Sequence, residues 1–164
     1  MTTQLNIGLV FAKEFIEIAP DFVLENGVVM TRLEDLLERA DFVSLNCDLN
    51  PTSYHLMNAR TLSLMNRSAV LINTSRGPVV DEPALVEALQ KGVIAGAALD
   101  VFEVEPLPAN SPLLKMDNVL LAPHCANSSP AAWERVHWNT IKNLLEGLGI
   151  SPSGDLKDDS TSQS

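Results

Sequence analysis

Three short motifs of the sequence carry an arginine, a glutamate and a histidine, each directly after a stretch that reads as a β-strand. Arg76 lies in INTSRG, Glu105 in LDVFEVEP and His124 in APHC. A guanidinium binds a carboxylate through two charge-assisted hydrogen bonds, and an imidazole exchanges protons near neutral pH. Together the three side chains could hold a carboxylic acid and move a proton at a neighbouring oxygen.

Arg76 and His124 also have simpler explanations. Arg76 could pair with a nearby carboxylate, and His124 could be a structural histidine in a loop. Both residues, however, follow strands of what we expect to be a parallel sheet, and ligands of such sheets bind at the carboxyl ends of the strands. This placement favours a functional role for both.

Glu105 could hold the second ring nitrogen of His124 and stabilise the imidazolium form. Glu103 competes for this role, but we expect it to be solvated. We expect His55, in a loop, and His137, on the last helix, to be structural.

Short apolar runs alternate with helical patterns, which is typical of βαβ units and a parallel sheet. The near-continuous hydrophobicity of the runs suits strands that are covered on both faces. The fold class we predict is α/β, a partial Rossmann-like, doubly wound parallel sheet with flanking helices. Strands are expected at residues 5–12, 41–46, 68–74, 94–101 and 118–122, with a short additional piece at 27–30.

The helices have recognisable ends. Thr31 and Glu34 form a capping-box pattern, and Asp81 and Gly92 flank an amphipathic run. The last helix is expected at residues 130–146. One face of this helix is apolar and consists of Trp133, Val136, Ile141, Leu144 and Leu145.

The composition excludes several classes of function. The chain has 164 residues, a net charge of −10 and no basic run, which argues against nucleic acid as a partner. No apolar stretch is long enough to cross a membrane. Cys47 and Cys125 have no metal-ligand spacing, so we expect no metal site and a reducing cytoplasm. We expect one domain at residues 1–150 and a disordered, Ser- and Asp-rich tail at 151–164.

The three motifs together resemble the D-isomer-specific 2-hydroxyacid dehydrogenases, in the later half of their nucleotide-binding domain. The resemblance runs from residue 36 to about residue 145 and includes ADFVSLNCDLNPTSYHL and AGAALDVFEVEP. It implies hydride transfer between NAD or NADP and the 2-carbon of a small 2-oxo or 2-hydroxy acid. Arg76 would bind the substrate carboxylate, His124 would be the acid and base, and Glu105 would be its partner.

The resemblance also implies which residues border the cofactor. They lie at or after the ends of four of the strands, and Asp100 among them would contact the nicotinamide amide. The expected cofactor-binding residues are Cys47, Asp48, Leu49, Asn50, Thr74, Ser75, Arg76, Asp100 and His124.

The sequence contains no GxGxxG turn, since only Gly8 and Gly27 precede Gly77. We therefore expect an N-terminally truncated domain with weak cofactor affinity and impaired activity on its own. The first strand is central in the strand order 3-2-1-4-5-6. We expect residues 5–12 to move into that place, or two chains to exchange or pair strands in a homodimer or a strand-paired oligomer.

Two further functions stay open at this point. The CDLN loop is also similar to that of the C-terminal-binding-protein corepressors. A non-catalytic, dimerising or nucleotide-sensing fragment is favoured by the absence of the glycine-rich turn. A cofactor-independent hydrolase would use His124 as base and Ser75, Ser128 or water as nucleophile. No GxSxG motif surrounds any serine, which argues against the hydrolase.

Overall fold

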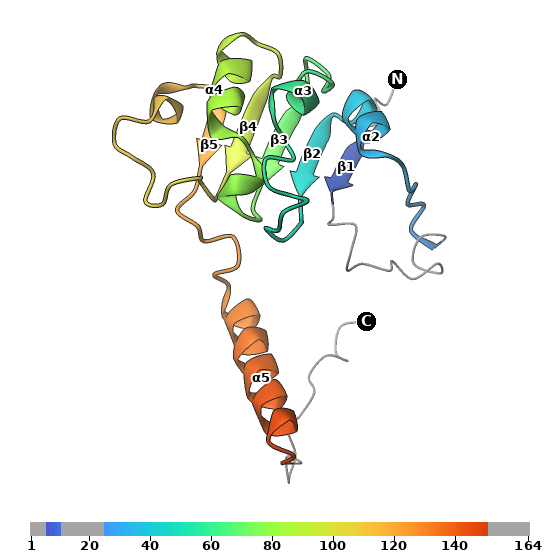
Figure 1. The fold of residues 1–164 in the computed structure, drawn as a ribbon, viewed down its shortest axis with the longest axis vertical. Coiled ribbons are helices and arrows are strands. Elements are labelled where there is room, and N and C mark those ends of the chain that lie inside the picture. The colour runs from blue at the N-terminus through green and yellow to red at the C-terminus, as the bar shows by residue number, and fades with distance from the viewer. Residues whose placement is uncertain (1–5, 11–24, 151–164) are drawn as a thin grey trace. The chain divides into compact units, whose positions relative to one another are not determined.

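A computed structural model describes residues 6–10 and 25–150 of the chain, as Figure 1 shows. The predicted tail at 151–164 and both ends of the first predicted strand lie outside these residues. The chain divides into two compact units, the first ending at Cys125 and the second beginning at Ala126. The sheet lies in the first unit and a single long helix in the second, and each unit is described by itself.

The sheet of the first unit has five parallel strands that follow one another in chain order. All five lie inside the ranges that the apolar runs predict, which confirms the α/β class. The strands are β1 (Ile7–Val10), β2 (Phe42–Leu45), β3 (Val70–Asn73), β4 (Gly96–Leu99) and β5 (Val119–Leu121).

Strand β1 pairs directly with β2, with Ile7 opposite Phe42 and Val10 opposite Leu45. In the strand order 3-2-1-4-5-6, which is common in this fold class, the first strand pairs with the fourth. β1 therefore takes the place beside β2 that the first strand has in that order, and no gap separates the described strands. β1 lies at the edge of the described sheet, so the pairing agrees with the first of the two expected arrangements but the central position does not.

One face of the sheet carries the hydrophobic core. Val43, Leu45 and Leu71 on this face have no exposed surface. A Cβ atom on Gly8 would lie 2.5 Å from Cδ2 of Leu36, which shows how closely the first of the covering helices packs here. The helices on this side in Figure 1 are α2 (Leu33–Arg39), α3 (Ala59–Leu62) and α4 (Glu82–Gln90).

The opposite face of the sheet is partly open. Ile7 and Leu9 on β1 are 68% and 51% exposed, and Leu120 on β5 is 72% exposed. The expectation that the strands are covered on both faces therefore holds for only one face among the described residues. We call this surface the open face.

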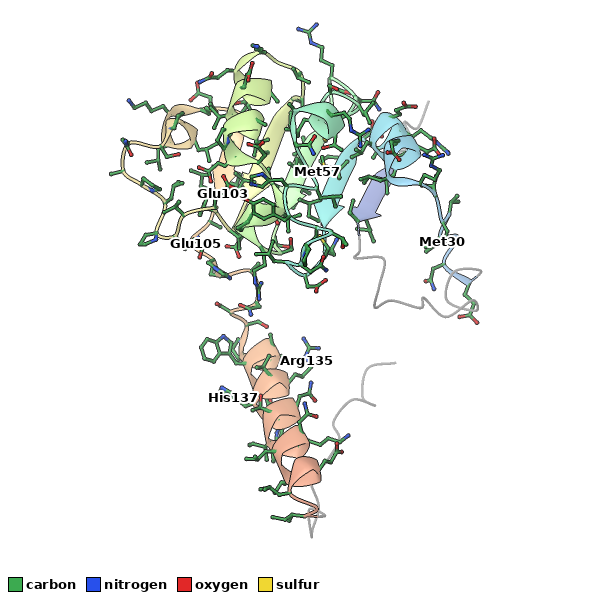
Figure 2. The ribbon with its side chains drawn as sticks, in the orientation of Figure 1. Met30, Met57, Glu103, Glu105, Arg135 and His137 are labelled. Atoms are coloured by element: carbon green, nitrogen blue, oxygen red, sulfur yellow. The ribbon has the colours of Figure 1, made fainter. Side chains whose placement is uncertain are left out.

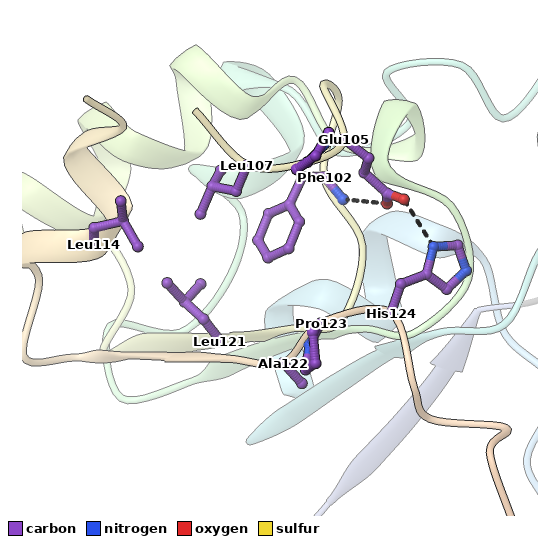
Figure 3. Close-up of a pocket in the computed structure, with 9 residues that line it drawn as sticks. Phe102, Glu105, Leu107, Leu114, Leu121, Ala122, Pro123 and His124 are labelled. Atoms are coloured by element: carbon purple, nitrogen blue, oxygen red, sulfur yellow. Dashed lines mark hydrogen bonds and ion pairs between the residues drawn. The ribbon is translucent and has the colours of Figure 1, made fainter. Parts of the chain in front are cut away.

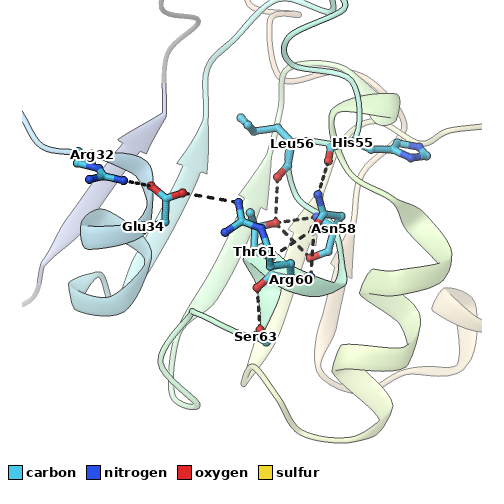
Figure 4. Close-up of polar contacts among 8 residues, drawn as sticks. All are labelled: Arg32, Glu34, His55, Leu56, Asn58, Arg60, Thr61 and Ser63. Atoms are coloured by element: carbon cyan, nitrogen blue, oxygen red, sulfur yellow. Dashed lines mark hydrogen bonds and ion pairs between the residues drawn. The ribbon is translucent and has the colours of Figure 1, made fainter.

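The predicted capping box at Thr31 and Glu34 is wrong. Helix α2 begins after Arg32, and no side chain caps it. Glu34 lies instead 3.8 Å from Arg32 and 3.6 Å from Arg60, because the two guanidinium groups flank its carboxylate (Figure 4). The predicted short strand at residues 27–30 is also wrong, since Val29 and Met30 are 74% and 65% exposed and pair with no strand.

A capping box does form at Asn58 and Thr61, at the start of α3 (Figure 4). The Asn58 side chain accepts from the N–H of Thr61 at 3.3 Å, and Thr61 Oγ1 accepts from the N–H of Asn58 at 2.7 Å. The predicted cap at Asp81 is confirmed, because its carboxylate accepts from the N–H of Ala84 at 3.1 Å. Both caps fix the loops that lead toward the carboxyl edge of the sheet.

The second unit consists of helix α5 (Pro130–Gly147), close to the predicted range. Ser129 caps its N-terminus by accepting from the N–H of Ala132 at 3.1 Å. The predicted apolar stripe faces solvent within this unit, with Trp133 55% and Leu144 61% exposed, and His137 lies on the same helix (Figure 2). None of the described helices is long and apolar enough to cross a membrane.

Candidate active site

The loop that carries Arg76 is fixed by a buried asparagine at the end of β3. Asn73 is 1% exposed, and its Oδ1 accepts from the N–H of Ser75 at 3.0 Å. Its Nδ2 donates to the carbonyl oxygen of Arg76 at 3.0 Å. The Arg76 guanidinium is left at the surface, where it donates to the carbonyl oxygen of Ser75 at 2.7 Å. It forms no ion pair with any described carboxylate, so the simpler explanation for this arginine is not observed.

The next residue, Gly77, brings two site loops into backbone contact. A Cβ atom at this position would lie 1.9 Å from the carbonyl oxygen of Phe102, far inside van der Waals contact. Only glycine therefore allows the turn after β3 to rest on the loop after β4. This contact joins the segment of Arg76 to the segment of Glu105.

Glu105 and His124 contact each other directly, as the sequence predicts (Figure 3). Glu105 Oε2 lies 2.8 Å from Nδ1 of His124, and its Oε1 accepts from the N–H of Phe102 at 3.0 Å. The hydrogen bond with His124, followed by that from Phe102, lowers the pKa of the Glu105 carboxyl below its ordinary value. Glu105 is therefore ionised near neutral pH, which makes Nδ1 of His124 the donor and leaves Nε2 free to meet a ligand.

The backbone of His124 has a φ of +56°, in the left-handed region that non-glycine residues seldom adopt. Asp100, at the end of β4 and only 5% exposed, accepts from the N–H of Cys125 at 2.8 Å. This buried carboxylate fixes the chain directly after His124. Such unfavourable backbone conformations are maintained where the surroundings over-determine them, often at functional sites.

The predicted cofactor-binding residues lie at the carboxyl ends of β2, β3, β4 and β5, but they differ in access. Thr74 is at the surface, and Leu49 is 43% exposed. Asp48 and Asn50 interact with each other, since Nδ2 of Asn50 lies 3.3 Å from a carboxylate oxygen of Asp48. Cys47 is 4% exposed, and burial raises the pKa of its thiol. The Cys47 side chain thus belongs to the core, and only its backbone can face a ligand.

A pocket of about 360 Å³ lies beside the Glu105–His124 pair (Figure 3). Its walls are apolar, and the segment after Glu105 supplies part of them. The lining residues are Phe102, Glu105, Pro106, Leu107, Leu114, Leu121, Ala122, Pro123 and His124. This pocket was not predicted from the sequence, although the apolar residues spaced through PLPANSPLL could have indicated that the segment folds back on the sheet.

Glu103 is not solvated as expected. Its side chain is 24% exposed, and its Oε1 lies 2.5 Å from Nε2 of His55. Sequence analysis assigned no partner to either residue, and they are 48 positions apart in the chain. No local signal could have paired them.

Comparison with known proteins shows the family. Residues 11–126 match the profile of the D-isomer specific 2-hydroxyacid dehydrogenase, NAD binding domain. Because this match covers more than half of the chain, the protein belongs to this family. The resemblance and the fold inferred from the sequence are confirmed.

The chain is 50% identical over 125 residues to a glyoxylate reductase of Korarchaeum cryptofilum. This match covers 76% of this chain and 38% of that relative. The solved D-lactate dehydrogenase of Aquifex aeolicus, complexed with NAD and lactic acid, superposes with a TM-score of 0.74 at 28% identity. That match covers 88% of this chain and 54% of the dehydrogenase.

A D-isomer specific 2-hydroxyacid dehydrogenase from Xanthobacter autotrophicus Py2, solved with NADPH and MES, has 41% identity and a TM-score of 0.57. The match covers 72% of this chain and 36% of that structure. Relatives were thus crystallised with either dinucleotide, and this chain spans well under two thirds of their lengths.

The contact at Gly77 predicts a large effect of a single methyl group. Gly77→Ala should lower the free energy of unfolding by about 3 kcal/mol or more, because a backbone carbonyl oxygen cannot move aside as a side chain can. Urea unfolding followed by circular dichroism measures the change. Gly147→Ala is the control, since nothing lies within 4 Å of a Cβ atom there. Equal stability of the two variants would contradict the close approach.

The lowered pKa of Glu105 depends first on His124. In His124→Ala we expect this pKa to rise toward its ordinary value, measured by ¹³C NMR titration of the side-chain carboxyl. His137→Ala, on α5, should leave it unchanged. A depressed carboxyl pKa contributes stability above the unfolded-state pKa, and this is lost as pH falls through the folded-state value. The free energy of unfolding of His124→Ala should therefore fall less on acidification than that of the unmodified chain. An unchanged Glu105 pKa in His124→Ala would contradict the contact between the two side chains.

Proposed function

We propose that this chain acts as an NAD(P)-dependent oxidoreductase of the D-2-hydroxyacid dehydrogenase type. The reaction is the interconversion of a small 2-oxo acid and the corresponding 2-hydroxy acid. The observation that carries the proposal is the Glu105–His124 contact, at the sheet edge where the loop of Arg76 also lies. The names of the glyoxylate reductase relatives support a small 2-oxo acid as substrate.

The roles follow from the geometry. Glu105 is ionised and holds Nδ1 of His124, so the ring presents Nε2 to the substrate (Figure 3). In reduction, Nε2–H donates its proton to the carbonyl oxygen, and in oxidation Nε2 accepts the hydroxyl proton. The exposed guanidinium of Arg76 binds the substrate carboxylate through two parallel hydrogen bonds. Glu105 compensates the charge of the imidazolium in both directions.

A bound nicotinamide dinucleotide would supply or accept the hydride. The loops at the carboxyl edge fit it, because Asp48, Leu49, Thr74 and Arg76 reach the surface where dinucleotides bind in this fold class. The phosphate side fits less well. Gly8, the one glycine in a described strand ahead of these loops, packs against Leu36 and cannot cradle a phosphate. The hydrogen bonds and the helix dipole of a glycine-rich phosphate turn would contribute about 4–8 kcal/mol, or about three decades or more in affinity.

The activity is tested with the purified chain at millimolar NADH or NADPH and glyoxylate, pyruvate or hydroxypyruvate. We expect oxidation of the dinucleotide that depends on the 2-oxo acid. His124→Gln should lower kcat about 10²- to 10⁴-fold, because proton transfer is lost. Arg76→Gln should mainly raise KM for the oxo acid.

His137→Gln is the control for these substitutions, because this histidine lies on α5. Absence of oxo-acid-dependent oxidation, together with no calorimetric binding of either dinucleotide, would favour the non-catalytic fragment. Cofactor-free ester hydrolysis that depends on His124 would favour the hydrolase.

We also propose that the chain forms a homodimer through β1. This strand is the edge of the described sheet, and Ile7 and Leu9 are exposed on its open face. An exposed edge strand is a template for pairing, and a two-fold axis would pair β1 with its own copy in an antiparallel manner. The pairing would continue the sheet and place cross-strand neighbours beside both side chains.

The free thiols of Cys47 and Cys125 support the cytoplasm as the location of the protein.

Light scattering after size-exclusion chromatography tests the dimer. We expect a dimer for the unmodified chain and a monomer for Leu9→Lys, because a lysine on an edge strand opposes pairing. Val136→Lys on α5 is the matched control and should remain dimeric. A monomer at all concentrations would contradict the proposal, and loss of the dimer only in Val136→Lys would assign the interface to α5.

A further inference from the structure

Glu103 connects three segments of the chain that are distant in sequence. Its Oε1 lies 2.5 Å from Nε2 of His55, in the loop after β2. Its Oε2 accepts from the N–H of Glu82 at 3.3 Å, and its own N–H donates to Oε2 of Glu82 at 3.2 Å. Each of the two glutamates thus binds the backbone of the other. We call His55, Glu82 and Glu103 the bridge cluster.

The histidine of the bridge cluster is itself held in a fixed orientation. The N–H of His55 donates to the carbonyl oxygen of Pro78 at 2.9 Å, and its own carbonyl oxygen accepts from Nδ2 of Asn58 at 2.9 Å (Figure 4). The imidazole stacks on Tyr54, with ring centroids 4.0 Å apart. The backbone φ of His55 is +49°. A ring constrained in this way gives Glu103 a stationary partner.

The bridge cluster holds two carboxylates close together and mostly out of water. Burial raises the pKa of Glu82, and the negative charge of Glu103 adds to the rise. Two neighbouring carboxylates repel each other, and the imidazole and the two backbone N–H groups offset this repulsion only in the observed geometry. The cluster therefore resists displacement of Glu103 from its position.

Glu103 stands between Phe102 and Glu105 in the chain, and Figure 2 shows Glu103 and Glu105 in the same part of the molecule. Phe102 donates its N–H to Glu105, and its carbonyl oxygen lies against Gly77. Within segment 102–105, Phe102 is thus held by Gly77 and Glu103 is held by His55 and Glu82 of the bridge cluster. Glu105, in contrast, is at the surface and depends on the backbone before it for its position.

We propose that Glu103, anchored by His55 and Glu82, is a positioning residue that holds segment 102–105 where the Glu105 carboxylate meets Nδ1 of His124. Glu103 has no contact with substrate in this role and acts through Glu105 alone. Its effect on turnover rests on the proposed function, whereas its effect on the Glu105–His124 contact does not.

The test measures the pKa of Glu105 by ¹³C NMR titration, without cofactor or substrate. In Glu103→Ala we expect this pKa to rise toward its ordinary value, because Glu105 moves away from His124. Loss of the Glu103 charge alone would lower it or leave it unchanged, since a neighbouring negative charge raises a carboxyl pKa. A rise therefore reports the lost contact. Glu103→Gln, which can still bind His55 and the N–H of Glu82, should largely preserve the depressed value.

Two further variants complete the test. His55→Asn, whose residue type tolerates a positive φ, removes the ring partner and should also raise the Glu105 pKa. Glu87→Ala is the matched control, because Glu87 is an exposed glutamate on the same helix as Glu82 and pairs with Lys91. It should leave the Glu105 pKa unchanged. Where oxo-acid reduction is measurable, Glu103→Ala should lower kcat by up to about 100-fold with little change in KM.

A purely structural bridge would lower the free energy of unfolding in Glu103→Ala and His55→Asn but leave the Glu105 pKa depressed, and this result would overturn the proposal. An equal rise in Glu103→Gln and Glu103→Ala would overturn it as well, because the glutamine retains the anchoring bonds. Absence of dehydrogenase activity with the expected pKa changes would contradict the proposed function and leave the positioning role supported.

Discussion

The backbone contact between Gly77 and Phe102 is the constraint on which the rest of the site depends. It sets the distance between the loop after β3 and the loop after β4, because no side chain intervenes. Arg76 precedes one side of the contact and Glu105 follows the other by three residues. A backbone contact cannot be adjusted by a change of rotamer, so the relative position of the two loops is set by the fold itself.

Buried polar side chains extend this constraint to the other site residues. Asn73 and Asp100 end neighbouring strands, and each binds the backbone of a site loop. A hydrophobic residue at either position would pack in the core but leave the loop without its hydrogen bonds. Two buried side chains at the carboxyl edge of the sheet, Asn73 and Asp100, thus fix the backbones of the surface loops that carry Arg76 and His124. This is why Arg76 and His124 can be exposed and still stand on fixed backbones.

The sequence predicted the five strands and the Glu105–His124 contact because both rest on local patterns. Apolar runs mark the strands, and strand ends of a parallel sheet meet at one edge whatever lies between them. The capping box at Thr31 does not form because the helix begins one residue later, after Arg32, and the Glu34 carboxylate lies near Arg60, which is distant in sequence. The contact between His55 and Glu103 could not be predicted either, because the two residues are 48 positions apart in the chain. The close approach at Gly77 was equally hidden, since a glycine before Pro78 also suits an ordinary turn.

The Glu105–His124 contact is independent of the strand that stands where a phosphate-binding turn usually lies. It is made between the segment after β4 and the segment after β5, and the turn at Gly77 and the bridge cluster support it. None of these elements belongs to β1, which occupies the first-strand place where dinucleotide phosphates are usually met. The proposed proton-transfer pair can therefore form its contact whether or not the chain binds dinucleotide phosphates tightly.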